Sequence, residues 1–94
     1  MRFAWDEAKN RSNKAKHGVS FDLAKLVFDD PFHLGVSDRY EQGEERWRTI
    51  GYVGAVALLV VIHTYVEQND DETIRIISAR KATRRERAIY EKGN

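Results

Sequence analysis

The carboxy-terminal segment concentrates cationic side chains directly after an apolar run. That run, Ile74–Ala79, is interrupted by Arg75, and the positive charges that follow it are Arg80, Lys81, Arg84, Arg85 and Arg87. Arginine binds phosphate well because its planar guanidinium donates two parallel hydrogen bonds to phosphate oxygens. We therefore predict an anion site where the apolar segment ends and a helix begins.

Arg80 is the first candidate for a catalytic cation. It closes a predicted strand beside the start of a predicted helix, where backbone N–H groups also favour an anion. The alternative is a surface arginine that pairs with Glu86 or with the acidic middle segment of the chain. Strand alternation puts Ser78 on the face of Arg80 and Arg75 on the opposite face, so we expect the two arginines not to share a face unless the strand bulges or its end bends.

Four other side chains are candidates for proton transfer. His17 is expected at a helix C-terminus, where the helix dipole favours the protonated imidazole, although it could also simply cap the helix. His63 lies near the end of the most apolar segment, and a structural hydrogen bond is its alternative role. Glu86 could act as a base or as the N3 residue of a capping box with Thr83. Tyr90 could stack on a nucleobase, donate a proton or pack in the core.

Charge is distributed unevenly along the chain, although its net value is only +1. Residues 1–17 and 73–94 are basic, whereas residues 20–45 carry seven Asp and Glu against two Lys and Arg. Lys9, Asn13 and Lys16 also share one helix face by their spacing. Basic ends that meet in space would form the footprint of a polyanion partner, and a set of solvated helix faces is the alternative.

Capping residues and periodicity predict the elements that position these side chains. We expect a short edge strand at residues 2–5, a helix from Asp6 to His17 closed by Gly18, and an apolar helix from Ser20 to Phe28 that ends before Pro31. Four strands then follow in a meander, at residues 32–36, 46–52, 55–65 and 72–80, with a loop at 38–45 and a turn at 68–71. Thr83 begins a last helix that runs to about Lys92.

This order predicts one α+β domain over residues 1–94. Its small antiparallel sheet combines the short N-terminal strand with the four-strand meander, and two N-terminal helices and one C-terminal helix cover one face. The chain has no cysteine and no signal peptide, and its longest apolar run, Val53–Ile62, is too short for a membrane helix, so we expect a cytoplasmic protein. Three scattered histidines without paired carboxylates indicate no metal site, and we expect no cofactor.

Several stretches occur together, in order, with the spacing of one protein family. They are Phe3-Ala4-Trp5-Asp6, then Lys9 and Asn13 ahead of Lys16-His17-Gly18-Val19-Ser20-Phe21, Glu45-Arg46-Trp47 with Ile50-Gly51, and Arg75-Ile76-Ile77-Ser78-Ala79-Arg80 followed by Ala82-Thr83-Arg84-Arg85-Glu86-Arg87 and Tyr90. With these residues the chain resembles the BrnT family of bacterial toxins, an RNase branch of the RelE-like type II toxin fold.

The resemblance implies a toxin that cleaves RNA without a metal ion, by attack of the 2′-hydroxyl on phosphate, and so slows translation. It also implies a BrnA-like antitoxin that silences the toxin and carries the DNA-binding module of a hetero-oligomer on operator DNA. The candidate catalytic residues are then Arg80, His17, Glu86, Tyr90 and His63. The candidate RNA contacts are Lys9, Asn13, Lys16, Arg46, Arg75, Ser78, Arg84 and Arg85. The alternative function is a non-enzymatic module that binds nucleic acid or a partner with the same basic face.

Overall fold

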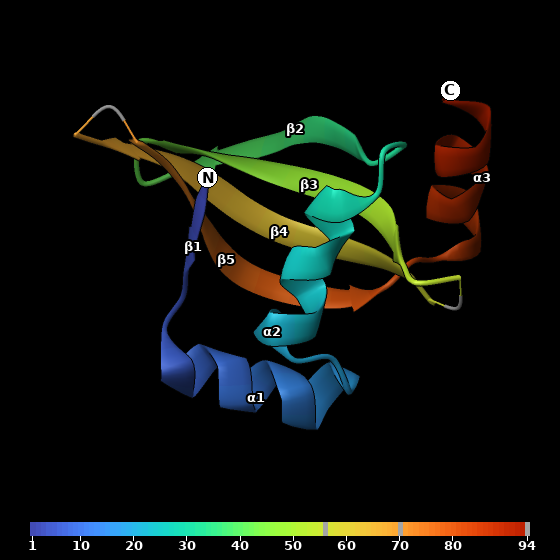
Figure 1. Ribbon diagram of the computed structural model, residues 1–94, viewed down its shortest axis with the longest axis horizontal. Coiled ribbons are helices and arrows are strands. Elements are labelled where there is room, and N and C mark those ends of the chain that lie inside the picture. The colour runs from blue at the N-terminus through green and yellow to red at the C-terminus, as the bar shows by residue number, and fades with distance from the viewer. Residues whose placement is uncertain (56, 70, 94) are drawn as a thin grey trace.

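The computed structural model describes residues 1–55, 57–69 and 71–93. Within them it contains five strands, three α-helices and one 3₁₀ segment, so the predicted α+β class is confirmed (Figure 1). The elements in chain order are β1 (Arg2–Ala4), α1 (Glu7–His17), α2 (Phe21–Ala24), η1 (Lys25–Asp29), β2 (Leu34–Glu41), β3 (Glu44–Val53), β4 (Ala57–Gln68), β5 (Asp71–Lys81) and α3 (Arg84–Lys92).

The five strands form one sheet in the order β1-β5-β4-β3-β2. The meander from β2 to β5 is antiparallel, as predicted. However, β1 pairs parallel with β5, with Arg2 opposite Thr73 and Ala4 opposite Arg75, so the sheet is mixed and the prediction of an antiparallel sheet was wrong for this strand. The path of the chain through the helices and the meander determines whether β1 runs parallel or antiparallel to β5. The three residues of β1 carry no sequence signal for that direction.

Capping side chains fix where the helices begin. Asp6 accepts hydrogen bonds from the N–H groups of Ala8 and Lys9, and Ser20 accepts one from Leu23. Gly18 ends α1 with a φ of 73°, the left-handed conformation that glycine adopts at least cost. The predicted helix from Ser20 to Phe28 is a single α-helical turn, α2, that tightens into the 3₁₀ segment η1.

Helices cover both faces of the sheet, which corrects the prediction that they share one face. On the first, here called the α2 face, Phe21, Ala24 and Val27 pack with Leu59, Val61, Ile74, Ile76 and Ala79. On the opposite face, here called the α3 face, Tyr90 packs with Ile50, Leu58 and Val60. β4 is apolar at successive positions from Leu58 to Ile62, so both of its faces must be covered.

The acidic segment Asp38–Glu45, predicted as a loop, forms the tip of a β-hairpin instead. β2 extends to Glu41, β3 begins at Glu44, and a two-residue turn joins them with positive φ at Gln42 (53°) and Gly43 (80°). Positive φ at both central positions is the requirement of a type I′ hairpin turn. The prediction failed because this exposed edge hairpin carries polar side chains on both faces and therefore lacks an apolar alternation.

Most other element boundaries agree with the sequence. The predicted strand at 46–52 is β3, and the one at 55–65 is β4 displaced by a few residues, with Val56 outside the described residues. The predicted turn at 68–71 separates β4 from β5, although Asp70 also lies outside the described residues. Among the described residues, no helix combines the length and the hydropathy that a membrane crossing requires.

Candidate active site

A β-bulge in β5 brings Arg75 and Arg80 to the same face of the sheet. Arg75 lies opposite Thr64 and Arg80 opposite Val60, but the pairing shifts by one residue between them, so that Ile77 has no opposite partner. An extra residue of this kind resets the alternation of side chains. Both arginines therefore lie on the α3 face: the prediction of opposite faces holds only for an unbroken strand, and β5 has the bulge that was left open as the exception.

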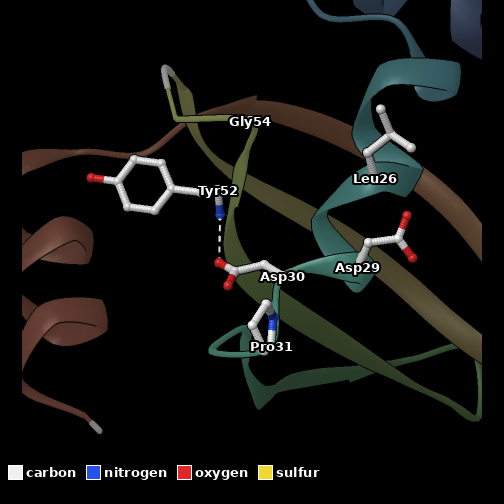
Figure 2. Close-up of a pocket in the computed structure, with 6 residues that line it drawn as sticks. All are labelled: Leu26, Asp29, Asp30, Pro31, Tyr52 and Gly54. Atoms are coloured by element: carbon white, nitrogen blue, oxygen red, sulfur yellow. Dashed lines mark hydrogen bonds between the residues drawn. The ribbon is translucent and has the colours of Figure 1, made fainter.

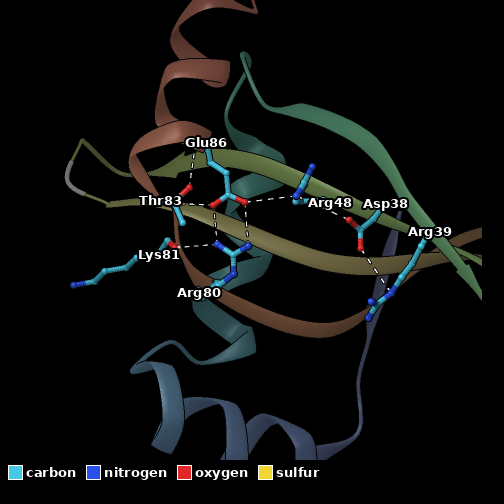
Figure 3. Close-up of polar contacts among 7 residues, drawn as sticks. All are labelled: Asp38, Arg39, Arg48, Arg80, Lys81, Thr83 and Glu86. Atoms are coloured by element: carbon cyan, nitrogen blue, oxygen red, sulfur yellow. Dashed lines mark hydrogen bonds and ion pairs between the residues drawn. The ribbon is translucent and has the colours of Figure 1, made fainter.

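Arg80 forms a bidentate ion pair with Glu86. Its Nη1 lies 2.7 Å from Oε1 of Glu86, and its Nη2 lies 3.0 Å from Oε2 (Figure 3). The same carboxylate accepts the N–H of Thr83 at 2.9 Å, and the Thr83 hydroxyl accepts the N–H of Glu86, which completes the predicted capping box. The capping role considered for Glu86 is therefore present, and so is the pairing with Glu86 that was the alternative considered for Arg80.

The ion pair sets the charge state of both groups. The hydrogen bond from Arg80, together with those from Thr83, lowers the pKa of Glu86 from 4.5 to about 2, although burial acts in the opposite direction. The carboxylate raises the pKa of Arg80 in return, chiefly through the same hydrogen bonds. Glu86 is thus a fixed anion near neutral pH and a poor proton acceptor, which suits a positioning residue better than a general base.

A second arginine, which the sequence analysis did not select, completes this cluster. Nη1 of Arg48 lies 3.7 Å from Oε2 of Glu86 and 4.0 Å from Oδ1 of Asp38 (Figure 3). Its Nε is buried and has no hydrogen-bond partner among the described residues. Arg48 is two residues from Arg46 and two from Ile50 along β3, so strand alternation alone could have placed it on one face with them, whereas its approach to Glu86 depends on the register of the sheet.

Further along the α3 face lies a second cationic group, made by Arg46 and Arg75. Nη2 of Arg75 lies 2.6 Å from Oε1 of Glu44, and Nη1 of Arg46 lies 3.0 Å from Oε2 of Glu41. Both arginines line a cleft of about 340 Å³ whose wall also includes Lys9 of α1. Two predicted RNA contacts of the strands are thus brought together with one from the first helix.

The predicted basic stripe of α1 borders the outer edge of β5. Lys9, Lys16, His17 and Ser78 line a shallow cleft of about 270 Å³ beside the bulge. Asn13 lies on the same helix face but is buried and fully engaged, since its Nδ2 donates to the carbonyls of Val19 and Ala79 (both 2.8 Å) and its Oδ1 accepts the N–H of Ala79. Asn13 therefore joins α1 to β5 through hydrogen bonds. Both hydrogens of its Nδ2 are used, so it has no donor left for RNA.

His63 is a core residue on the α2 face, so its selection as a catalytic candidate is corrected. The side chain is fully buried, its Nε2 lies 2.7 Å from the Thr49 hydroxyl, and its ring packs edge-on against Phe28 and Tyr65. Burial lowers its pKa to about 4, so the imidazole is neutral at physiological pH. Across the sheet from Arg80, it cannot reach a phosphate bound there.

Tyr90 is held in a polar junction around Asp30. Its hydroxyl donates to Oδ2 of Asp30 at 2.6 Å, and burial followed by this carboxylate raises the pKa of Tyr90 to about 12. The N–H of Tyr52 donates to the same Oδ2 at 2.8 Å, in a cleft lined by Leu26, Asp29, Asp30, Pro31, Tyr52 and Gly54 (Figure 2). Tyr90 therefore joins α3 to η1 and β3, which favours the packing role among its alternatives.

Arg84 and Arg85 are exposed in the first turn of α3, and neither has an ion pair among the described residues. They follow Thr83, so they flank the Arg80–Glu86 pair and extend its positive surface. Within the described part of the chain, no group of three or more His, Cys, Asp and Glu side chains could hold a metal ion. The arrangement can therefore bind a polyanion across the α3 face, and Arg80 is fixed there by two hydrogen bonds to Glu86.

Comparison with known proteins shows the family to which the chain belongs. No curated protein matches the chain significantly. The 1.1 Å crystal structure of the Brucella abortus ribonuclease toxin BrnT shares the fold, with a TM-score of 0.63, 24% sequence identity, and coverage of 89% of this chain and 99% of that chain. The family model of BrnT, the ribonuclease toxin of a type II toxin–antitoxin system, matches residues 5–86. This chain therefore belongs to the BrnT family of ribonuclease toxins of type II toxin–antitoxin systems.

Proposed function

We propose that this protein cleaves RNA at a phosphate bound by Arg80 and Arg48 at the start of α3, without a metal ion. The observation that carries the proposal is the convergence of both guanidiniums on the buried carboxylate of Glu86, beside a capped helix N-terminus. Glu86 and Asp38 offset the charges of Arg80 and Arg48, and the exposed Arg84 and Arg85 that follow on α3 make the surroundings positive for an anion.

The reaction would be an internal transfer at phosphorus. The 2′-oxygen of one nucleotide attacks the adjacent phosphorus and loses its proton to a base, the bond from phosphorus to the 5′-oxygen breaks, and that oxygen takes up a proton. The products are a 2′,3′-cyclic phosphate and a 5′-hydroxyl end. Arg80 and Arg48 stabilise the charge that develops on the phosphoryl oxygens, a contribution of about 10²–10³ in rate per donor by analogy with oxyanion holes.

Glu86 serves as a positioning residue in this scheme. Its two oxygens fix the plane of the Arg80 guanidinium, and its hydrogen bond with Thr83 ties that plane to α3. Arg80 retains Nε and part of Nη2 for a ligand, because the pair with Glu86 and a weak contact from Nη1 to the Lys81 carbonyl use the other donors. Such preorganisation avoids reorganising the donors during the reaction.

His17 is our candidate for proton transfer. It is exposed at the end of α1 in the cleft that includes Ser78, which shares the α3 face with Arg80. Imidazole is the commonest general acid and base in enzymes. His63 and Tyr90 do not fit this role, because the first is buried on the α2 face and the hydroxyl of the second is bound to Asp30.

The family implies a cognate antitoxin. We propose further that the toxin inhibits translation by cutting RNA in the cytoplasm, and that residues 1–94 form one RelE-like toxin domain. A BrnA-like antitoxin would neutralise it and would supply the operator-binding module of the hetero-oligomer. The absence of a recognisable DNA-reading motif in this sequence supports that division of labour.

The test is cleavage of a defined, protein-free RNA in EDTA, read on a denaturing gel. The wild type should cut the RNA, Arg80→Ala should lose about 10²–10³ in rate, and Arg11→Ala, which removes an exposed arginine of α1 outside both basic clefts, should retain the activity. Equal cutting by Arg80→Ala and wild type would refute the assigned site. If the wild type fails in EDTA but cuts with Mg²⁺, the metal-independent mechanism is wrong.

A further inference from the structure

We propose that the cleft formed by Lys9, Arg46 and Arg75 is a second phosphate subsite, and that Glu44 occupies it in the free protein. The subsite would bind a phosphate of the same RNA strand at some distance from the one at Arg80. This inference rests on the proposed function, and it adds a minimum length of substrate and a competition between the protein's own carboxylate and the RNA.

The hydrogen-bonding capacity of the Arg46 guanidinium is only partly used in the free protein. Its side chain is only 18% exposed, and its Nε is buried without a hydrogen-bond partner among the described residues. The ion pair with Glu41 is close, at 3.0 Å, yet Oε2 of Glu41 is also buried without a correctly aligned hydrogen bond. Because an unsatisfied buried donor is costly, a phosphate oxygen that accepts a hydrogen bond from Arg46 would be favoured.

A buried hydroxyl lies between the two arginines. Thr64 is 1% exposed, lies opposite Arg75, and has an Oγ1 without a hydrogen-bond partner in the described part of the chain. The register of β3 and β4, continued by one position beyond the pair Trp47 and His63, puts Arg46 opposite Thr64 on its other side. One rung of the sheet thus presents two guanidiniums and an unused hydroxyl on the α3 face.

Glu44 holds the place of a ligand in this cleft. Its Oε1 lies 2.6 Å from Nη2 of Arg75, and both side chains remain 43% exposed. A carboxylate offers arginine the same planar pair of acceptors as a phosphate, and exposed ion pairs contribute little to stability, so the two can exchange. The hairpin that carries Glu41 and Glu44 therefore screens the cations that RNA would use.

The spacing of the two phosphate sites sets the length of the substrate. Arg75 and Arg80 lie opposite Thr64 and Val60, four residues apart on β4, which corresponds to about 13 Å along the strand. One phosphodiester group cannot span that distance, so different phosphates of one strand would occupy the two sites. We therefore expect RNA to lie along β5 on the α3 face, and very short oligonucleotides to be poor substrates.

The experiment measures binding separately from cleavage. A single-stranded RNA with 2′-O-methyl groups at every position, which cannot be cut by this reaction, is titrated by fluorescence anisotropy over a series of salt concentrations. Arg75→Ala should raise Kd about tenfold and reduce the slope of log Kd against log salt by about 0.7, the value for one phosphate contact on a single strand. Glu44→Gln should lower Kd about threefold, because Arg75 is released.

Two matched variants control for the loss of charge alone. Arg11→Ala removes an exposed arginine of α1 that lines neither cleft, and Glu91→Gln neutralises an exposed carboxylate of α3. Both should bind as the wild type does. In an oligonucleotide series with one neutral methylphosphonate linkage at each position in turn, one linkage should abolish the effect of Arg75→Ala.

A salt slope that Arg75→Ala leaves unchanged, or an equal loss in Arg11→Ala, would overturn the subsite. If unmodified RNA is then still cut in an Arg80-dependent manner, the subsite alone is wrong and the proposed function remains. If the wild type neither binds the modified RNA nor cuts the unmodified one, both are wrong.

Discussion

Arg80 and Glu86, on either side of the turn between β5 and α3, share a bidentate ion pair inside the capping box of that helix. One carboxylate therefore orients the proposed catalytic cation and stabilises the first turn of α3. Substitutions at the two positions should consequently have different effects on stability and on cleavage.

Arg80→Lys should retain the fold and lose cleavage. Lysine keeps the charge but offers a single ammonium group, which cannot form the planar two-point contact with Glu86 and leaves the phosphate donor unfixed. We expect a loss of about 10² in the single-turnover cleavage rate. Arg11→Lys, at an exposed position of α1 outside both basic clefts, serves as the control and should cut at the wild-type rate. Wild-type cleavage by Arg80→Lys would mean that only the charge matters.

Glu86→Gln should lower stability near neutral pH by about 1–3 kcal/mol, since it removes an ionic partner of Arg80 while it keeps the shape. The folded pKa of about 2 lies below the ordinary value of 4.5, so the contribution of Glu86 is complete above pH 4.5 and is lost as the pH falls toward 2. Urea denaturation at a series of pH values should therefore show a weaker acid dependence in the variant. Glu91→Gln, exposed on the same helix, should match the wild type.

His63 should make the protein sensitive to mild acid. Its folded pKa of about 4 lies below the ordinary 6.5, so the unfolded chain binds a proton that the folded protein excludes. The free energy of unfolding should fall as the pH decreases from about 6.5 to about 4, by up to roughly 3 kcal/mol. In His63→Gln, which does not titrate, the curve over this range should be flatter. An unchanged slope in that variant would show that other groups cause the loss.

Asn13→Ala separates a structural role from RNA binding. The substitution leaves backbone groups of Val19 and Ala79 without their partner, and we expect a loss of about 2–4 kcal/mol in the free energy of unfolding. At a temperature where the variant is folded, its affinity for the 2′-O-methyl RNA should equal that of the wild type. Lys16→Ala should give the converse result, with unchanged stability and weaker RNA binding. Loss of affinity without loss of stability in Asn13→Ala would restore it to the RNA site.

The features that the sequence alone predicted are those that depend on neighbouring residues, chiefly the ends of the helices. Asp6, Ser20 and Thr83 begin their helices with side-chain caps, Gly18 ends α1, and the capping box of Glu86 is present. These are interactions within a few residues, so their signals lie in short stretches of sequence. The same holds for the apolar strand β4, whose side chains require cover whatever their partners are.

Features that depend on pairing between distant segments were missed. The parallel direction of β1, the opposite positions of α2 and α3, and the approach of Arg48 to Glu86 all follow from sheet register. For the candidate site, the sequence predicted the pairing of Arg80 with Glu86 as an alternative, but it could not show that His63 and Asn13 are buried. The reason is that burial of a polar residue against a distant carbonyl or hydroxyl has no local sequence signature.

The extra residue at Ile77 makes the position of Arg80 depend on the number of residues in this part of β5 more than on their types. A deletion of one residue at this point would return β5 to regular pairing and leave Arg80 on the α3 face. A deletion or insertion of one residue between Ser78 and Arg80 would instead turn the guanidinium toward the apolar core under α2. Among relatives of this protein, single-residue gaps in this short stretch should therefore distinguish active toxins from inactive ones more sharply than substitutions of its apolar residues do.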